Sequence, residues 1–234
     1  FVKSRFEVYQ KISYQVKSIF KKYTDLIEPI SLDEAYLDIT NLPEGFHSAT
    51  EVAQQIRKEI FETTKLTASA GVSFNKFLAK ISSDVNKPNG IFVLTPTNAQ
   101  NFLAKLEIRK FYGIGKVTAS KFQKMGILYG SDLLRLPLSS LEQYFGKNGK
   151  RYYNLARGID NRTVKPHRER KSIGAERTFS SDIDNVEDLL AHINFIAKTV
   201  AKRCRKNGKK GRTITLKIKY GDFTQITRGT TSNQ

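Results

Sequence analysis

The sequence is poor in cysteine, methionine and long apolar runs, with only Cys204 and Met125 of the two sulfur-containing residue types. A single cysteine excludes an internal disulfide and is typical of a reduced intracellular protein. No run of apolar residues is long enough to cross a bilayer, and no signal peptide is recognisable. We therefore expect a cytoplasmic protein. The three histidines share no spacing, and we assign them no role.

Acidic residues are also scarce relative to basic ones. Forty lysines and arginines stand against 22 aspartates and glutamates, which gives a formal net charge of +18. This excess predicts a polyanionic partner, and nucleic acid is the first candidate because lysine and arginine release counterions from its phosphates. A membrane partner is not expected, because no basic amphipathic helix with an apolar aromatic face is present.

The apolar spacing divides the chain into three parts. Residues 28–94 alternate between strand and helix patterns, which predicts an α/β layer. After Pro96 the pattern becomes helical, and a basic, proline-containing linker (161–173) then leads to a mixed final part. The expected fold class is multidomain α+β. The expected helices are 4–23, 49–63, 75–85, 98–105, 116–125, 138–145, 149–157 and 185–205, and the expected extended segments are 28–40, 66–72, 91–94, 172–180 and 212–220.

Two adjacent carboxylates, Asp33 and Glu34, interrupt the apolar segment 28–40 (EPISLDEAYLDIT). Acidic residues are poor strand formers, so hydrophobic patterning does not explain them. Magnesium ions prefer oxygen ligands, and two-metal phosphoryl transfer needs carboxylates that converge on one point. Neighbours on a regular strand point to opposite faces, so a shared metal site requires a twist, a bulge or a strand end here. Two solvated acids in a surface turn are the alternative.

A second motif, residues 68–90 (ASAGVSFNKFLAKISSDVNKPNG), joins a strand to a helix that begins at Asn75 and Lys76. Helix N-termini attract phosphate through their free N–H groups. Lys80 lies four residues after Lys76 and hence on the same helix face. Lys87 follows the helix in the sequence KPNG. Each lysine alone is most simply interpreted as a solvated surface charge.

A third motif, residues 111–126 (FYGIGKVTASKFQKMG), has the pattern of a helix-hairpin-helix. Gly113 and Gly115 allow the backbone to approach a DNA phosphate, and Lys116 starts the second helix. A plain glycine turn between helices is the alternative, since a lone Gly-x-Gly is weak evidence.

The strand 213–220 (TITLKIKY) has an apolar face and a polar face that carries Lys217 and Lys219. A cationic sheet face of this kind is suited to contact with a DNA backbone. A half-buried strand with an ordinary solvated face explains the pattern equally well.

Segment 28–40 closely resembles the catalytic palm motif of Y-family (translesion) DNA polymerases, and the match is long and unbroken. Residues 68–90 resemble the same palm, and 111–126 resemble the family's thumb. Residues 170–179 (RKSIGAERTF) resemble the start of its little finger. The resemblance implies a partial palm over 1–95, a helical thumb over 96–165 and an incomplete α/β little finger over 166–234.

The resemblance also assigns roles to individual residues. Asp33 and Glu34 would bind two Mg²⁺ ions, with Glu34 also counted as catalytic, and Asp38 would be structural. Lys87 would contact the triphosphate of the incoming nucleotide. The implied DNA contacts are Gly113, Gly115, Lys116, Lys217 and Lys219.

The implied activity is DNA-directed DNA synthesis of the error-prone translesion type, in DNA repair and damage tolerance. Its partners would be primer-template DNA, including damaged DNA, and deoxynucleoside triphosphates. The family's first metal-binding aspartate, its fingers and its gate against ribonucleotides are expected before Phe1, and we do not transfer a metal role to Asp25. A sliding-clamp contact is expected in parts outside this chain. We expect the 234-residue chain alone to have little or no polymerase activity.

Three alternatives remain at this point. A non-catalytic DNA-binding module explains the charge and the hairpin but not Asp33 and Glu34. A nucleotidyl cyclase also uses paired carboxylates, but it does not need segments that hold a duplex. Within the Y family, the catalytic subunit of polymerase V is the runner-up to the bacterial polymerase IV branch, which the segments 65–71 (KLTASAG) and 170–174 (RKSIG) favour.

Overall fold

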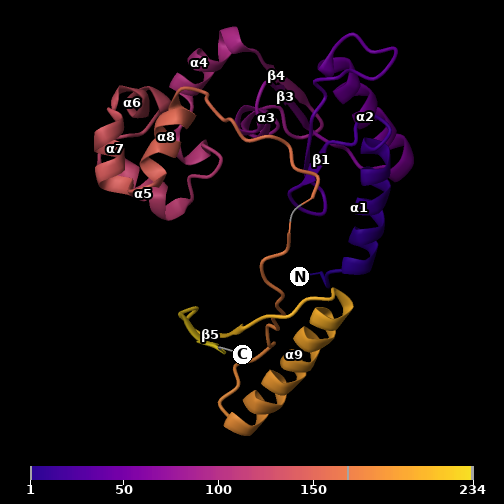
Figure 1. Cartoon of the computed structure of the whole chain (residues 1–234), viewed down its shortest axis with the longest axis vertical. Helices are drawn as coiled ribbons and strands as arrows, with labels where there is room; N and C mark the ends of the chain where they lie inside the picture. The colour runs from indigo at the N-terminus through magenta and orange to yellow at the C-terminus, as the bar shows by residue number, and fades with distance from the viewer. Residues whose placement is uncertain (1, 168, 233–234) are drawn as a thin grey trace. The chain divides into compact units, whose positions relative to one another are not determined.

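The computed structural model describes residues 2–167 and 169–232. The chain forms two compact units, residues 1–167 and 168–234, and each is described by itself. The first unit begins with a mixed part in which α1 and α2 pack side by side (Figure 1). The elements of this mixed part are α1 (Phe6–Phe20), β1 (Ile27–Pro29), β2 (Ala35–Leu37), α2 (Ala49–Thr64), β3 (Ala70–Ser73), α3 (Lys76–Ser82) and β4 (Ile91–Leu94).

These strands form two small sheets. β1 and β2 pair in antiparallel register, while β3 and β4 are parallel and are joined through α3. The single extended segment predicted over 28–40 is therefore wrong, because the chain reverses at residues 30–34. The Ser31 hydroxyl accepts hydrogen bonds from the N–H groups of Asp33 and Glu34, and the Ile30 N–H donates to the Glu34 carbonyl (2.9 Å). A serine turn of this kind competes locally with a strand.

The rest of the first unit is helical, as the pattern after Pro96 predicts. The predicted helix over 138–145 is confirmed, and a short helix over 130–135 was not predicted. The elements are α4 (Pro96–Lys105), the 3-10 helix η1 (Ile108–Lys110), α5 (Lys116–Lys124), α6 (Gly130–Arg135), α7 (Leu138–Phe145) and α8 (Asn148–Ala156).

The first unit contains two buried apolar clusters. The smaller one lies between α1 and α2 and contains Ile19, Val52, Ile56 and Ile60. The larger one continues without a break from the β3–α3–β4 region into the helical part. Its members include Phe77, Leu78, Ile81, Leu94, Leu103, Ile108, Phe111, Phe122, Leu133, Leu141, Tyr152 and Leu155.

The start of the predicted linker is held against the mixed part. The Asp160 carboxylate accepts a hydrogen bond from the Phe77 N–H (3.0 Å) and pairs with Arg162 (2.7 Å). The Lys165 N–H donates to Glu28 (2.7 Å). Residues 160–165 therefore belong to the packed first unit, although they form no helix or strand.

The second unit consists of α9 (Val186–Lys206) and an antiparallel hairpin of β5 (Thr213–Lys219) and β6 (Gln225–Thr231). The predicted helix and the strand at 212–220 are confirmed. The strand predicted over 172–180 is wrong: this segment pairs with no strand in the described residues, and Arg203 of α9 donates a hydrogen bond to its Gly174 carbonyl. No residue of α9 is buried.

No helix within residues 2–167 and 169–232 has the length and apolar composition needed to span a membrane.

Candidate active site and nucleic-acid interface

The predicted carboxylates lie together at the end of the β1–β2 hairpin. Asp33 is exposed and Glu34 is half-buried. The Ser31 hydroxyl donates to Oδ1 of Asp33 (2.5 Å). Because both acids occupy a turn that ends where β2 begins, the opposite-face geometry of a regular strand does not separate them. Both side chains line one cavity.

Two lysines of α3 hold this hairpin from the same helix face, as their spacing predicts. Nζ of Lys80 lies 2.9 Å from Oε1 of Glu34, and the Lys80 side chain is only 13% exposed. Nζ of Lys76 lies 2.5 Å from Oε2 of Glu28 and 4.9 Å from the centre of the Tyr36 ring. Lys76 is therefore a buried structural cation, and Lys80 is the residue that reaches the carboxylate site.

The N-terminus of α3 is already engaged by side chains of this chain. Asn75 caps the helix by accepting from the Leu78 N–H (2.9 Å), and Asp160 accepts from the Phe77 N–H (3.0 Å). The phosphate attraction that the sequence suggests at this helix end is thus satisfied by an internal carboxylate.

Gly71 allows α3 to lie close against β3. A Cβ atom at this position would stand 2.1 Å from the Ala79 carbonyl oxygen and 2.4 Å from the Ser83 nitrogen. Both are backbone atoms, so a side chain would push the helix away. The position of Lys80 near Glu34 depends on this close approach.

Lys87 lies in a turn beyond α3 that is tied to α2. Arg57 donates to the Ala68 carbonyl (2.7 Å) and to the side chain of Asn89 (2.6 Å). Nζ of Lys87 lies 2.5 Å from Oδ1 of Asp84. The hydrogen bond to Asp84 raises the pKa of Lys87, with smaller contributions from the charges of Glu34 and Asp33, so the ammonium form is stabilised.

One cavity of about 1220 Å³ brings these groups together. Asp33, Glu34, Lys80 and Lys87 all line it, and apolar residues of α2 line another part of its wall. Residues of β2 and of β3 line it as well, and among the described residues neither strand has a second pairing partner. The site therefore combines carboxylates, ammonium groups and an apolar wall.

The carboxylate oxygens of Asp33 and Glu34 are suitable ligands for a hard divalent cation, but they form only part of a coordination shell. No described residue donates a hydrogen bond to Oδ2 of Asp33 or Oε2 of Glu34, so one oxygen of each carboxylate is available. Oxygen ligands of this type suit Mg²⁺. Within residues 2–167 and 169–232, no group of three or more His, Cys, Asp or Glu side chains is placed to hold a metal. Among the described residues, Asp33 and Glu34 are the predicted ligands that line this cavity.

The predicted hairpin lies at the start of α5 and is exposed at Gly113, Gly115 and Lys116. Gly113 has φ +94°, and the Arg151 guanidinium lies where its Cβ would stand (2.1 Å). Gly115 caps α5 without a side-chain hydrogen bond. The start of α5 is thus exposed at Gly115 and Lys116 and has no side-chain cap, with the cationic side chains of Lys116 and Arg151 nearby. Such a helix N-terminus is suited to a phosphate.

The two β5 lysines are exposed but not free. Lys217 forms an ion pair with Glu176, and Nζ of Lys219 lies 4.6 Å from the centre of the Phe223 ring. The opposite face, predicted to be apolar and half-buried, is largely exposed: Ile214 is 72% exposed. A two-stranded hairpin with one helix has too little surface to bury that face.

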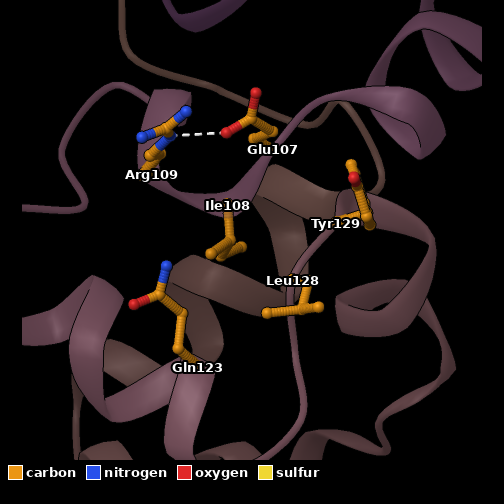
Figure 2. A pocket seen from close by; sticks show the side chains of 6 residues that line it. All are labelled: Glu107, Ile108, Arg109, Gln123, Leu128 and Tyr129. Carbon is orange, nitrogen blue, oxygen red and sulfur yellow. Dashed lines mark hydrogen bonds and ion pairs between the residues drawn. The ribbon is translucent and has the colours of Figure 1, made fainter.

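A second, smaller depression of about 150 Å³ lies in the helical part (Figure 2). Its residue Glu107 forms ion pairs with Arg109 (2.5 Å) and with Lys110 (3.3 Å). It contains none of the predicted site residues. It is lined by Glu107, Ile108, Arg109, Gln123, Leu128 and Tyr129.

Comparison with known proteins identifies the family of this chain. Three family models match: the impB/mucB/samB family over residues 1–84, the IMS family HHH motif over 96–127, and the impB/mucB/samB family C-terminal domain over 170–234. A Y-family DNA polymerase chimera of Dbh and Dpo4 superposes with a TM-score of 0.85 at 32% identity, over 98% of this chain and 66% of that chain. DinB from Sulfolobus solfataricus superposes with a TM-score of 0.65 at 32% identity, over 100% of this chain and 68% of that chain.

The chain belongs to the Y family of DNA polymerases. Among curated Y-family relatives, DNA polymerase IV 3 of Mesorhizobium japonicum is 53% identical over 97% of this chain and 63% of its own length. DNA polymerase IV of Clostridioides difficile is 52% identical over 97% of this chain and 63% of its own length. The chain thus spans less than two thirds of the length of these relatives. Membership of the Y family implies dependence on a divalent metal ion.

Sequence reasoning missed part of this site. It did not identify Asp84, which pairs with Lys87, or Asp160 and Arg162, which line the same cavity. No sequence pattern marks these three residues. The position of Lys80 could be predicted, because its spacing of four residues from Lys76 places both lysines on the same helix face.

Proposed function

We propose that this chain supplies the carboxylates, the phosphate-binding lysine and the duplex grip of a DNA-directed DNA polymerase of the translesion type. The single observation that carries the proposal is the convergence of Asp33 and Glu34 with Lys80 and Lys87 on one cavity. The reaction is attack of a primer 3′-hydroxyl on the α-phosphorus of a deoxynucleoside triphosphate, with release of pyrophosphate.

Each residue has a defined task in this reaction. Asp33 and Glu34 would hold Mg²⁺, two ions per site, and Lys80 keeps Glu34 in place. When bound, Mg²⁺ supplies charge neutralisation and activation of the attacking oxygen. Lys87 neutralises the phosphates that become the leaving group. The two ammonium groups keep the site attractive to a polyanion.

The hairpin and the second unit hold the substrate duplex. The exposed N–H groups after Gly113 and Gly115, together with Lys116, bind a backbone phosphate without reading the sequence. Lys217 and Lys219 add backbone contacts, for which Lys217 exchanges Glu176 for a phosphate. We assign the palm to 1–95, the thumb to 96–165 and the little finger to 166–234.

The remaining partners follow from this activity. The substrates are primer-template DNA, including damaged DNA, and deoxynucleoside triphosphates, which places the protein in the cytoplasm and in DNA repair.

Primer extension with Mg²⁺ tests the proposal, using a protein extended to the length of the relatives. The isosteric double variant Asp33→Asn/Glu34→Gln is compared with Glu44→Gln, a control at an exposed acid. We expect the control to extend the primer and the double variant to bind DNA without extending it. If the unmodified protein binds DNA with steep salt dependence but extends no primer, a non-catalytic DNA-binding module replaces this proposal.

A further inference from the structure

Four charges of alternating sign form a row across the candidate site. Nζ of Lys80 lies 2.9 Å from Oε1 of Glu34 and 3.9 Å from Oδ2 of Asp84. The other oxygen of Asp84, Oδ1, lies 2.5 Å from Nζ of Lys87. The row therefore connects the β1–β2 turn to the turn that carries Lys87. Asp84 is the only member without a role so far.

The two ion pairs of Asp84 differ in their surroundings. The Asp84 and Lys87 side chains are 55% and 51% exposed, so this pair is well hydrated and readily exchanged. The Lys80 side chain is 13% exposed and is fixed by Glu34 as well. Asp84 thus lies between a mobile cation and a fixed cation.

A polyphosphate that enters the cavity competes with Asp84 for Lys87. A polyphosphate carries several negative charges against one on Asp84, and its oxygens likewise accept charge-assisted hydrogen bonds from a lysine. When Lys87 moves to a phosphate, the Asp84 carboxylate keeps Lys80 as a neighbour at 3.9 Å, and its 55% exposed side chain stays hydrated. The exchange of Lys87 from Asp84 to a phosphate therefore costs little free energy.

We propose that Asp84 is a positioning residue that holds the Lys87 ammonium in the unliganded site and releases it to the phosphates of the incoming nucleotide, with Lys80 compensating the released carboxylate. This inference rests on the proposed function, because it assumes that Lys87 binds the triphosphate. It adds that Asp84 lowers the affinity for polyphosphate and thereby assists the release of pyrophosphate.

A double-mutant cycle on the 234-residue chain tests the exchange, with binding of inorganic tripolyphosphate measured by calorimetry. The variants are Asp84→Asn, Lys87→Ala and their combination. The matched control is Glu62→Gln, which neutralises a carboxylate in another exposed ion pair, with Lys58 at 4.0 Å. The cycle subtracts tripolyphosphate bound elsewhere on this basic protein.

We expect Asp84→Asn to tighten binding by about two- to fivefold, the range for an exposed ion pair. The gain should disappear in the Lys87→Ala background and shrink at high salt. Asp84→Glu, which keeps the charge, and Glu62→Gln should change binding by less than about twofold. If Asp84→Asn does not fold, Asp84→Ser serves as the second neutral substitution. In the extended protein, Asp84→Asn should lower KM for the nucleotide without raising kcat.

Weaker binding in Asp84→Asn, or an equal gain with and without Lys87, overturns the exchange. If Lys87→Ala weakens binding while Asp84→Asn shows no coupling to it, only this inference fails. If Lys87→Ala leaves binding unchanged, the inference fails together with the triphosphate role of Lys87. Primer extension is scored separately, so the polymerase proposal stands or falls on its own measurement.

Discussion

Lys76 of α3 and Glu28 of β1 form an ion pair of 2.5 Å in which the lysine side chain is 8% exposed and the glutamate side chain 23%. Lys76 also donates to the Thr163 carbonyl (3.3 Å), and Glu28 accepts from the Lys165 N–H (2.7 Å). One ion pair therefore connects the hairpin, the helix and the segment 160–165. These are the elements around the candidate site.

Replacing Lys76 by alanine should strongly destabilise the first unit, because it leaves the Glu28 carboxylate without its cation in a poorly hydrated position. We expect a loss of about 3 kcal/mol in the free energy of unfolding. Urea unfolding followed by tyrosine fluorescence measures it, since the chain has ten tyrosines and no tryptophan. Lys58→Ala, which removes an exposed ion pair, should cost less than about 0.5 kcal/mol. Equal losses in the two variants would contradict a structural role for Lys76.

The first unit should lose stability in acid through Glu28 and Asp160. Burial raises the pKa of Glu28, but hydrogen bonds from Lys76 and the Lys165 N–H outweigh it, and the net pKa lies below the usual value. Burial also raises the pKa of Asp160, and the hydrogen bond from Arg162 again outweighs it. Both carboxylates therefore bind protons less readily in the folded state than in the unfolded state.

This sign means that the stabilisation is complete above the unfolded pKa values, about 4, and is lost as the pH falls through the lower folded values. We expect the urea midpoint of the first unit to fall progressively as the pH drops below about 4. Glu28→Gln should lower the midpoint at pH 7 and make the acid dependence shallower. Parallel pH curves for the variant and the unmodified chain would show that Glu28 does not contribute.

Gly71→Ala should separate α3 from β3. The new methyl group would meet the Ala79 carbonyl of α3 and the nitrogen of its C-cap residue Ser83, which cannot move without shifting the helix and Lys80 with it. Overpacking of this kind costs about 1–3 kcal/mol, measured as the shift in the urea midpoint. Gly115→Ala is the matched control, because it has φ −77° and open space around its Cβ. Equal stability of the two variants would be evidence against the close approach.

Lys116→Ala should weaken DNA binding evenly across sequences, because a phosphate contact reads no bases. Removing one such contact makes the slope of log affinity against log salt shallower by about 0.9. Fluorescence anisotropy with two unrelated duplexes over a salt series measures both effects. Lys58→Ala, on the exposed face of α2, should leave the slope unchanged. A strong preference of the variant for one duplex would argue against a backbone contact.

The sequence predicted some elements with their bounds. The helix over 138–145 follows from its helical apolar spacing, and the strand over 91–94 from a continuous apolar run between Gly90 and Pro96. The same-face placement of Lys76 and Lys80 follows from helix geometry alone. Asp38 also behaves as a structural residue, since it accepts hydrogen bonds from the N–H (3.0 Å) and hydroxyl (2.6 Å) of Thr40.

The remaining errors arise where a local turn or a distant partner decides the structure. The Ser31 turn splits one apolar run into two strands of three residues, which periodicity cannot resolve. β6 contains few apolar residues and exists because it pairs with β5, next to a turn in which Asp222 accepts from the Thr224 N–H. The partners of Asp84 and Asp160 could not be predicted from the sequence either, because these contacts form only when the chain folds. The roles of Asp33, Glu34 and Lys87 stay predictions until the variants are measured.

The continuous core that runs from α3 into α8 has a mechanical consequence. Phe77 and Leu94 on one side and Phe111 and Leu155 on the other are buried in one cluster, so bending the chain at Pro96 would expose apolar surface that this cluster buries. Under the proposed function, resistance to such bending would keep the phosphate contact at Gly113 at a steady separation from the carboxylates at Asp33. That separation would set how many base pairs lie between the contacted phosphate and the primer end.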